Sequence, residues 1–303
     1  MCAEERGILM KFTKMHGCGN DYIYVDCTKD ELLDPEKTSI FVSNRHFGVG
    51  SDGLILINPS DKADFYMAMY NADGSKGEMC GNGIRCVGKY VYDHGLTDKT
   101  EIEIDTPAGI KKLNLNIENG KVATVRVNMG SPELTATKIP VTHPEPEMIN
   151  APMEVNGELF KVTCVSMGNP HCVTFVEKDV RQIDLEKIGP SFENHPIFPK
   201  RVNTEFANVL NRSEIRMRVW ERGSGETLAC GTGACATAVA AIKNGLTDNK
   251  VTLHLRGGDL VIEYDEEKNE VYMTGPATEV FSGEVEIPDV LPNAEDNVKI
   301  YNI

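Results

Sequence analysis

Features typical of membrane, exported and zinc-binding proteins are absent from this sequence of 303 residues. No apolar run approaches the roughly 20 residues that a membrane-spanning helix needs. The opening stretch MCAEERGILMKF carries acidic residues early and has no apolar core segment, so we expect no secretory signal or transit peptide. No Cys-x-x-Cys pair occurs, which disfavours a structural zinc site. We therefore expect no membrane partner and no bound metal.

Basic side chains are scarce relative to acidic ones. The 31 Lys and Arg residues against 46 Asp and Glu residues give a formal net charge of −15. No surplus of positive charge is available to offset phosphate groups, so we expect no nucleic-acid partner. The nine cysteines are an odd number in a long chain, which predicts free thiols in a reducing, cytoplasmic setting rather than a disulfide framework.

Cofactor signatures are missing as well. The sequence has no Walker pattern, no Gly-x-Gly-x-x-Gly after a predicted strand and no evident Schiff-base lysine motif, so we expect no cofactor. Apolar residues make up 41% of the chain and charged residues 25%, as in a soluble globular protein with a substantial core. The length is about twice that of a usual domain, which predicts two domains.

Two short stretches of the sequence resemble each other. The first is NADGSKGEMCGNGIRCVGKYV from Asn71, and the second is ERGSGETLACGTGACATAVAA from Glu221. Aligned without a gap, Cys80 falls on Cys230 at an offset of 150 positions (230 − 80). In both copies a Gly-rich loop carries a cysteine and leads into a helical pattern. These helices are expected over Ile84–His94 and Ala234–Asn244, each closed by a left-handed glycine cap at Gly95 and Gly245.

The position of each cysteine predicts its chemistry. The first N–H groups of a helix lack intrahelical partners, and the helix dipole is positive at that end. We therefore expect Cys80 and Cys230 to have a pKa below the free-thiol value of about 8.5. The same N–H groups can hold a carboxylate. The alternative is that both cysteines are small buried residues at two ordinary helix starts.

The remaining elements repeat in the same order in the two halves. In the first half a helix is expected over Glu36–His46, with Asp34 as its N-cap and Pro35 in its first turn, and Asn119-Gly120 predicts a hairpin turn. Strands of the first half are expected over Ile8–Met15, Tyr22–Asp26, Leu54–Ile57, Phe65–Tyr70, Glu101–Asp105, Ile110–Ile117 and Val122–Asn128. Those of the second half are expected over Leu159–Val165, Cys172–Val176, Phe206–Leu210, Glu214–Trp220, Val251–Leu255, Leu260–Tyr264, Glu270–Thr274 and Thr278–Ile287, with a short helix over Asp184–Ile188.

These repeats predict an α/β (α+β) fold of two pseudo-symmetric domains related by internal duplication, with the active site in the cleft between them. We expect an N-terminal domain over 8–135 with Cys80, a Pro-rich crossing segment over 136–154, a C-terminal domain over 155–287 with Cys230, and a tail over 288–303. Two acid–base groups on opposite faces of one carbon invert a stereocentre, because a thiolate removes the proton and a thiol returns one. The pair of cysteines therefore predicts a racemase or epimerase.

The motifs MHGCGNDYIYVD, YNADGS with MCGNGIRC, SMGNPH, RVNTEF and ERGSGETLACGTGA resemble the diaminopimelate epimerase family over about Met10–Glu286. The resemblance implies a cofactor-free isomerase that interconverts L,L- and meso-2,6-diaminopimelate in lysine and peptidoglycan-precursor synthesis. It also implies a homodimer, and domains built as mostly antiparallel curved sheets or barrels around a central helix.

By this resemblance Cys80 and Cys230 are the catalytic acid–base pair, and His171 and Glu221 tune the pKa of the thiols. The substrate contacts implied are Asn20, Asn71, Gly81, Asn82, Asn169, Asn203, Glu221, Arg222, Gly231 and Thr232. A substrate end with both an ammonium and a carboxylate needs acceptors and donors, which Glu221 and Arg222 supply. Gly53 is a further candidate, although many relatives carry Gln there and glycine offers only its backbone.

Other interpretations remain open at this point. The asparagines are also typical turn residues, Glu221 and Arg222 also fit a surface ion pair, and His171 also fits a structural role. A racemase of the proline racemase kind is the nearest alternative enzyme, but that family commonly has His where this chain has Asn82. A thiol-based metal-binding or scaffold protein is the alternative that involves no catalysis.

Overall fold

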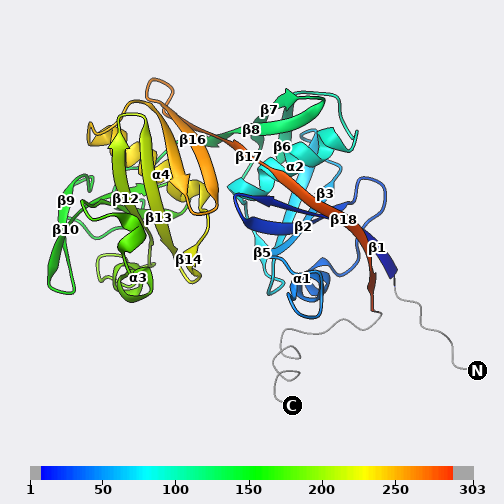
Figure 1. Cartoon of the computed structure of the whole chain (residues 1–303), viewed down its shortest axis with the longest axis horizontal. Helices are drawn as coiled ribbons and strands as arrows, with labels where there is room; N and C mark the ends of the chain where they lie inside the picture. The colour runs from blue at the N-terminus through cyan, green and yellow to red at the C-terminus, as the bar shows by residue number, and fades with distance from the viewer. Residues whose placement is uncertain (1–7, 289–303) are drawn as a thin grey trace, which may run out of the picture. The chain divides into compact units, whose positions relative to one another are not determined.

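The structure is a computed structural model that describes residues 8–288 (Figure 1). Over this range the chain is a mixed α/β fold with eighteen strands, four α-helices and one 3-10 helix, which confirms the predicted fold class. Contacts between residues divide the chain into two compact units. Unit 1 comprises 8–125 together with 277–288, and unit 2 comprises Arg126–Pro276.

Unit 1 is a sheet built around one long helix, α2 (Gly81–Asp93), with a shorter helix, α1 (Pro35–Ser43). Its strands are β1 (Ile8–Gly17), β2 (Asn20–Asp26), β3 (Gly53–Asn58), β4 (Phe65–Asn71), β5 (Lys76–Gly77), β6 (Glu101–Asp105), β7 (Lys111–Glu118), the first part of β8 (Lys121–Gly130) and β18 (Thr278–Ile287). Neighbouring strands are antiparallel except for the pairs β2–β3 and β4–β6.

Unit 2 repeats this arrangement around α4 (Gly231–Lys243). Its further elements are β9 (Ala151–Val155), β10 (Glu158–Ser166), β11 (Pro170–Phe175), the 3-10 helix η1 (Val180–Gln182), α3 (Leu185–Glu193), β12 (Asn203–Asn211), β13 (Glu214–Glu221), β14 (Gly225–Thr227), β15 (Lys250–Leu255), β16 (Gly258–Asp265) and β17 (Glu270–Pro276). The two parallel pairs are β11–β12 and β13–β15, at the same places in the strand sequence as in unit 1. This matching order of parallel and antiparallel pairs supports the internal duplication.

The boundaries of the two units differ from the expected domain ranges of 8–135 and 155–287. Strand β18 belongs to unit 1, because it pairs antiparallel with β1 from Ile8↔Ile287 to His16↔Thr278. In unit 2 the matching neighbour of β10 is β9, which comes just before it in the chain. The expected crossing segment, 136–154, thus contributes most of this edge strand. Of the expected tail, 288–303, only Pro288 lies within the described residues.

The two central helices are both largely buried, but they differ in how their apolar residues are distributed. Helix α2 is amphipathic and buries Ile84, Val87 and Val91. Helix α4 reads GTGACATAVAAIK, is apolar around most of its circumference and is buried along nearly its whole length. A helix that is apolar on all sides requires cover on all sides. Its many alanines allow the surrounding strands to approach closely.

Both central helices end in the predicted glycine cap. Gly95 and Gly245 have φ values of +73° and +68°. The Gly95 N–H donates to Tyr92 O, and the next N–H, of Leu96, donates to Val91 O. This pair of bonds is the Schellman arrangement, which satisfies the last carbonyl groups of a helix. Asn119 and Gly120 also both have positive φ, as the predicted hairpin turn requires.

Two local predictions need correction. Asp34 precedes α1 as expected, and Pro35 is its first residue, but the Asp34 side chain makes no capping hydrogen bond because its backbone is left-handed, with φ +48°. A side-chain cap requires an extended residue at this position. The short helix expected over Asp184–Ile188 continues as α3 through Pro190 to Glu193. Trp220, Phe192 and Phe206 belong to the core that α3 covers, and this tertiary packing stabilises the longer helix.

Candidate functional site

Each cysteine lies at the N-terminus of a central helix, as predicted. Cys80 is the N-cap of α2, with φ −126° and ψ 115°, and Cys230 is the N-cap of α4, with φ −118° and ψ 111°. The Gly83 N–H donates to Cys80 Sγ at 3.3 Å, and the Gly233 N–H donates to Cys230 Sγ at 3.4 Å. The thiols thus take the place that Ser or Asp usually occupies at a helix start.

The glycines after the cysteines allow close packing. A Cβ added to Gly83 would lie 2.7 Å from Ile55 Cδ1, and one added to Gly233 would lie 2.5 Å from Glu205 Oε1. Both distances are too short for a real side chain. Glycine at this position lets the first turn of each helix lie directly against the neighbouring strand, β3 or β12, and an added Cβ would force Ile55 or Glu205 to move.

In unit 1, Cys80 contacts one of the predicted substrate residues. Its thiol donates to Asn20 Oδ1 at 3.2 Å, and the Asn20 amide donates to Asp52 Oδ2 at 2.7 Å. Asp52 is in turn paired with Arg45, which also binds Asp21 through a 2.7 Å contact. The sequence did not single out Asp52 or Arg45, whose contacts fix the position of the Asn20 amide.

The other predicted residues of unit 1 are held by local contacts. The Asn71 amide donates to Ser75 Oγ at 2.9 Å, and Asn82 Oδ1 accepts from the buried Arg85 at 3.2 Å. Gly81 is the first residue of α2. At Gly53 a Cβ would lie 2.1 Å from Tyr70 O, so any side chain would force β3 and β4 to shift. Gly53 therefore offers a ligand nothing beyond its backbone.

In unit 2, the predicted residues take part in two sets of hydrogen bonds. His171 Nε2 lies 2.9 Å from Asn169 Oδ1, and His171 Nδ1 lies 2.7 Å from Glu205 Oε1. Asn203 Oδ1 accepts from the Arg222 N–H at 2.8 Å, while the Asn203 amide donates to Pro170 O at 3.1 Å. Asn203 thereby joins the first residue of β11 to the residue that follows β13.

Of the remaining predicted residues of unit 2, Thr232, Gly231 and Glu221 lie near Cys230. Thr232 Oγ1 is 3.5 Å from Cys230 Sγ, and Gly231 is the first residue of α4. Glu221 accepts a hydrogen bond from the Thr227 hydroxyl. Arg222 does not form an ion pair with Glu221 in the described contacts; its guanidinium donates to Lys200 O at 3.0 Å. The surface ion pair considered as an alternative is therefore not observed.

The predicted lowering of the pKa is wrong for Cys230. Burial raises the pKa of the Cys230 thiol well above its usual value, and the nearby carboxylates of Glu221 and Glu205 raise it further. The Thr232 hydroxyl and the Gly233 N–H lower it, but they do not compensate. Only 6% of Cys230 is exposed, so the loss of hydration outweighs the helix terminus. Burial likewise raises the pKa of Glu221, against the hydrogen bonds from Thr227 and Cys230.

Glu205 is the residue that sequence reasoning missed. Its side chain is fully buried and contacts His171, and its Oε2 atom has no hydrogen-bond partner in the described part of the chain. It lies within the RVNTEF motif, on the same face of β12 as Asn203, because alternate strand residues share a face. An acidic residue inside an otherwise buried strand was the signal that could have identified it.

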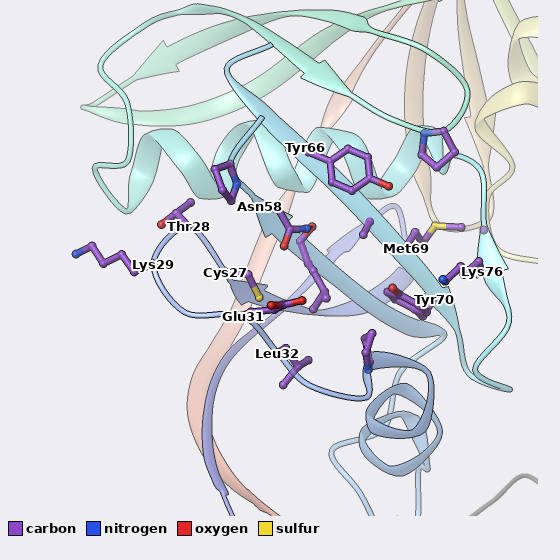
Figure 2. Close-up of a pocket in the computed structure, with 16 residues that line it drawn as sticks. Cys27, Thr28, Lys29, Glu31, Leu32, Asn58, Tyr66, Met69, Tyr70 and Lys76 are labelled. Carbon is purple, nitrogen blue, oxygen red and sulfur yellow. The ribbon is translucent and has the colours of Figure 1, made fainter. Parts of the chain in front are cut away.

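A separate cavity of about 600 Å³ opens on unit 1 (Figure 2). It is lined by Tyr66 and Tyr70 of β4, by Lys76, and by the segment that includes Cys27 and Leu32. Ala68 and Met69 of the same strand also line it. None of the predicted site residues lines this cavity.

Two kinds of feature are absent from residues 8–288. No group of three or more His, Cys, Asp or Glu side chains there could hold a metal ion. No helix in the same range is long and apolar enough to cross a membrane.

Solved structures with low sequence identity share the fold. A Bacillus anthracis phenazine biosynthesis protein of the PhzF family superposes with a TM-score of 0.66 at 14% identity, covering 92% of this chain and 100% of that one. A hydroxyproline epimerase from Agrobacterium vitis gives a TM-score of 0.66 at 13% identity, with 96% and 95% covered.

Several proteins share a much higher sequence identity with this chain. A diaminopimelate epimerase from Agathobacter rectalis is 63% identical over 285 residues, which cover 92% of this chain and 100% of the relative. Those from Acetivibrio thermocellus and Methanococcus maripaludis are 57% and 56% identical, covering 93% and 92% of this chain and 100% of each relative. The diaminopimelate epimerase family model matches residues 12–135 and 163–280. With the duplicated sheets and their capping cysteines, these matches show that the chain belongs to the diaminopimelate epimerase family of isomerases.

Proposed function

We propose that this protein converts L,L-2,6-diaminopimelate to meso-2,6-diaminopimelate without a cofactor, with Cys80 and Cys230 as the acid–base pair. Membership of the family supports the substrate. The observation that supports the mechanism is the duplicated placement of one cysteine at the N-cap of each central helix, where each sulfur accepts a backbone N–H. The family context further suggests a cytoplasmic homodimer that supplies lysine and peptidoglycan precursors.

The proposed reaction moves one proton off the α-carbon and another onto its opposite face. One thiolate takes the α-proton and becomes a thiol, and the electron pair left on carbon delocalises into the substrate carboxylate. Free N–H groups at a helix start are suited to bind that carboxylate as its negative charge grows. The other thiol then donates its proton to the opposite face of the carbon. In the reverse reaction the two sulfurs exchange roles.

The other predicted residues would bind the substrate. Gly81 and Asn82 in unit 1, and Gly231 and Thr232 in unit 2, would hold the reacting end at the two helix starts. Glu221 is suited to accept from an ammonium group, and Arg222 to grip a carboxylate with two parallel bonds. The set of candidate contacts is completed by Asn20, Asn71, Asn169, Asn203 and, through its backbone, Gly53. His171 and Glu221 would tune the charge around Cys230.

The test is solvent isotope exchange. L,L-Diaminopimelate incubated with the protein in D₂O should gain deuterium at one α-carbon and appear as the meso isomer. Proline and 4-hydroxyproline should gain none, which separates the assignment from a proline racemase activity. No deuterium in diaminopimelate would refute the proposed function.

Two pairs of variants test the roles of the cysteines. Cys80→Ala and Cys230→Ala should each abolish epimerisation while the far-ultraviolet circular dichroism spectrum stays that of the wild type. Cys86→Ala and Cys235→Ala are matched controls, because both residues are buried in the same helices but not at their N-caps. Full activity in either N-cap variant would remove that cysteine from the mechanism. Light scattering of the purified chain would test the homodimer.

A further inference from the structure

The surroundings of the two N-cap cysteines differ although their backbones match. Below Gly233 of α4 lies the carboxylate of Glu205, whereas below Gly83 of α2 lies the methyl group of Ile55. The strand registers also correspond, because Val173 pairs with Glu205 in unit 2 as Tyr24 pairs with Ile55 in unit 1. Glu205 and Ile55 therefore occupy equivalent places in the two copies.

A second position differs in the same way. Asn20 and Asn169 are separated by 149 positions (169 − 20), and the same offset places Tyr22 opposite His171. Cys80 thus has a tyrosine and an isoleucine in the places where Cys230 has a histidine and a glutamate. The first pair is uncharged at neutral pH, and the second contains an acid and a base.

The carboxylate of Glu205 is not needed to fill space. Ile55 shows that an apolar side chain fits the equivalent place between strand and helix. Yet Glu205 is fully buried, and its Oε2 has no hydrogen-bond partner in the described part of the chain. An unsatisfied buried carboxylate oxygen is destabilising, so its presence in a packed core indicates a role other than stability.

The contacts of Glu205 indicate that role. Its Oε1 lies 2.7 Å from His171 Nδ1, and the opposite ring nitrogen lies 2.9 Å from Asn169 Oδ1. The imidazole is therefore fixed at both nitrogens, between a buried carboxylate and a predicted substrate contact. The titratable groups that face Glu205 within unit 2 are His171 of β11, Cys172 beside it, Glu221 of β13 and Cys230 of α4.

We propose that Glu205 is a positioning residue for the epimerisation. It holds His171 against Asn169 and places a buried carboxylate group behind Cys230, so that two cysteines with equivalent backbones work in unlike electrostatic surroundings. This inference rests on the proposed two-base function and extends it. Burial raises the pKa of the Cys230 thiol, and the two carboxylates of Glu221 and Glu205 raise it further.

The test is the Glu205→Gln variant, which keeps the size of the side chain and its acceptor oxygen but removes the charge. The rate of Cys230 modification by methyl methanethiosulfonate, a small thiol reagent, is followed against pH by peptide mass spectrometry without substrate. Because only the thiolate reacts, the midpoint of this profile reports the ionisation of the thiol. We expect E205Q to lower the Cys230 midpoint by about one pH unit or more, and to leave the Cys80 midpoint unchanged.

A matched control is Glu226→Gln, which also removes a largely buried, ion-paired carboxylate from unit 2 but one bound to Arg218 and Arg256. It should leave the Cys230 midpoint in place. An unchanged Cys230 midpoint in E205Q, or equal shifts of both cysteines, would overturn the proposal. Since no substrate is used, this result is independent of whether diaminopimelate is turned over.

A second measurement needs no variant. In ¹⁵N-histidine spectra of the wild-type protein, the Nδ1 atom of His171 should carry a proton, because the acceptor atom Glu205 Oε1 lies 2.7 Å from it. A His171 ring with Nδ1 unprotonated near neutral pH would contradict the proposed contact, even if E205Q does not fold.

Discussion

A methyl group added at the first turn of each central helix should affect the two units unequally. In Gly233→Ala the new Cβ would lie 2.5 Å from Glu205 Oε1 and 3.3 Å from Cys230 Sγ. Glu205 has little room to move, since it is fully buried and its Oε1 is held by His171 at 2.7 Å. In Gly83→Ala the nearest atom, at 2.7 Å, is Ile55 Cδ1, the far end of a flexible side chain.

The magnitudes follow from two opposing effects. Alanine in place of glycine stabilises a helix by about 1 kcal/mol, and overpacking a core costs about 1–3 kcal/mol. At Gly83 a rotation of Ile55 relieves most of the overlap, so the two effects should nearly cancel. At Gly233 the overlap remains, and we expect a net loss of about 1–2 kcal/mol in the free energy of unfolding. Displacement of the Cys230 thiol should also lower kcat by about tenfold or more.

Urea unfolding followed by circular dichroism, together with isotope exchange on L,L-diaminopimelate, measures both effects on the same preparations. The comparison of G233A with G83A controls for the change in helix propensity, since both sites are the third residue of a central helix. If G83A is the more damaged variant, or if G233A unfolds and turns over like the wild type, the argument from the rigid Glu205 contact is refuted.

Two further predictions concern stability. Burial raises the pKa of Cys86 to about 11 in the folded protein, whereas a cysteine in the unfolded chain ionises at about 8.5. The stability that this thiol contributes is therefore complete below about pH 8.5 and is lost as the pH rises toward about 11. From about pH 8 to about pH 10 the wild type should therefore lose about 2 kcal/mol more unfolding free energy than Cys86→Ala; parallel losses in urea titrations would contradict this. Gly245→Ala should cost about 1 kcal/mol in the same assay, because Gly245 has φ +68° although nothing lies within 4 Å of an added Cβ. If G245A matches the wild type, backbone strain at the cap is not the reason for the glycine.

Local signals in the sequence predicted the helices and turns that carry the cysteines. The glycine caps, the Asn119-Gly120 turn and the two N-cap positions depend on residues within a few places of one another, where steric rules apply directly. The order of the strands was also predictable, because one half of the chain repeats the other. The side-chain contacts of Asn20 with Cys80, and of His171 with Glu205, depend on strand pairing and were outside the reach of these signals.

Two expectations from the sequence differ from the structure for the same reason, because both depend on contacts between residues far apart in the sequence. The unit to which β18 belongs is decided by its ladder with β1, which joins residues at the two ends of the described chain. The pKa of Cys230 is decided by burial and by carboxylates on β12 and at the end of β13. The sequence near Cys230 contains the helix start that favours a thiolate but not the packing that disfavours it. Desolvation outweighs a helix terminus when a group is nearly fully buried.

The duplication also explains how the two N-cap cysteines can have unlike surroundings while the fold of the two units stays the same. In each unit the backbone of the helix start, the capping glycine and the strand beneath it are the same, so the sulfur is held in the same local geometry. The residue facing that first turn is free to differ, because Ile55 and Glu205 are similar in length and both fit below a glycine. Substitution at this one strand position therefore changes the electrostatic environment of a cysteine while leaving its position in the helix unchanged. A nearly symmetric scaffold can in this way hold two acid–base groups in the same backbone geometry but in unlike electrostatic surroundings.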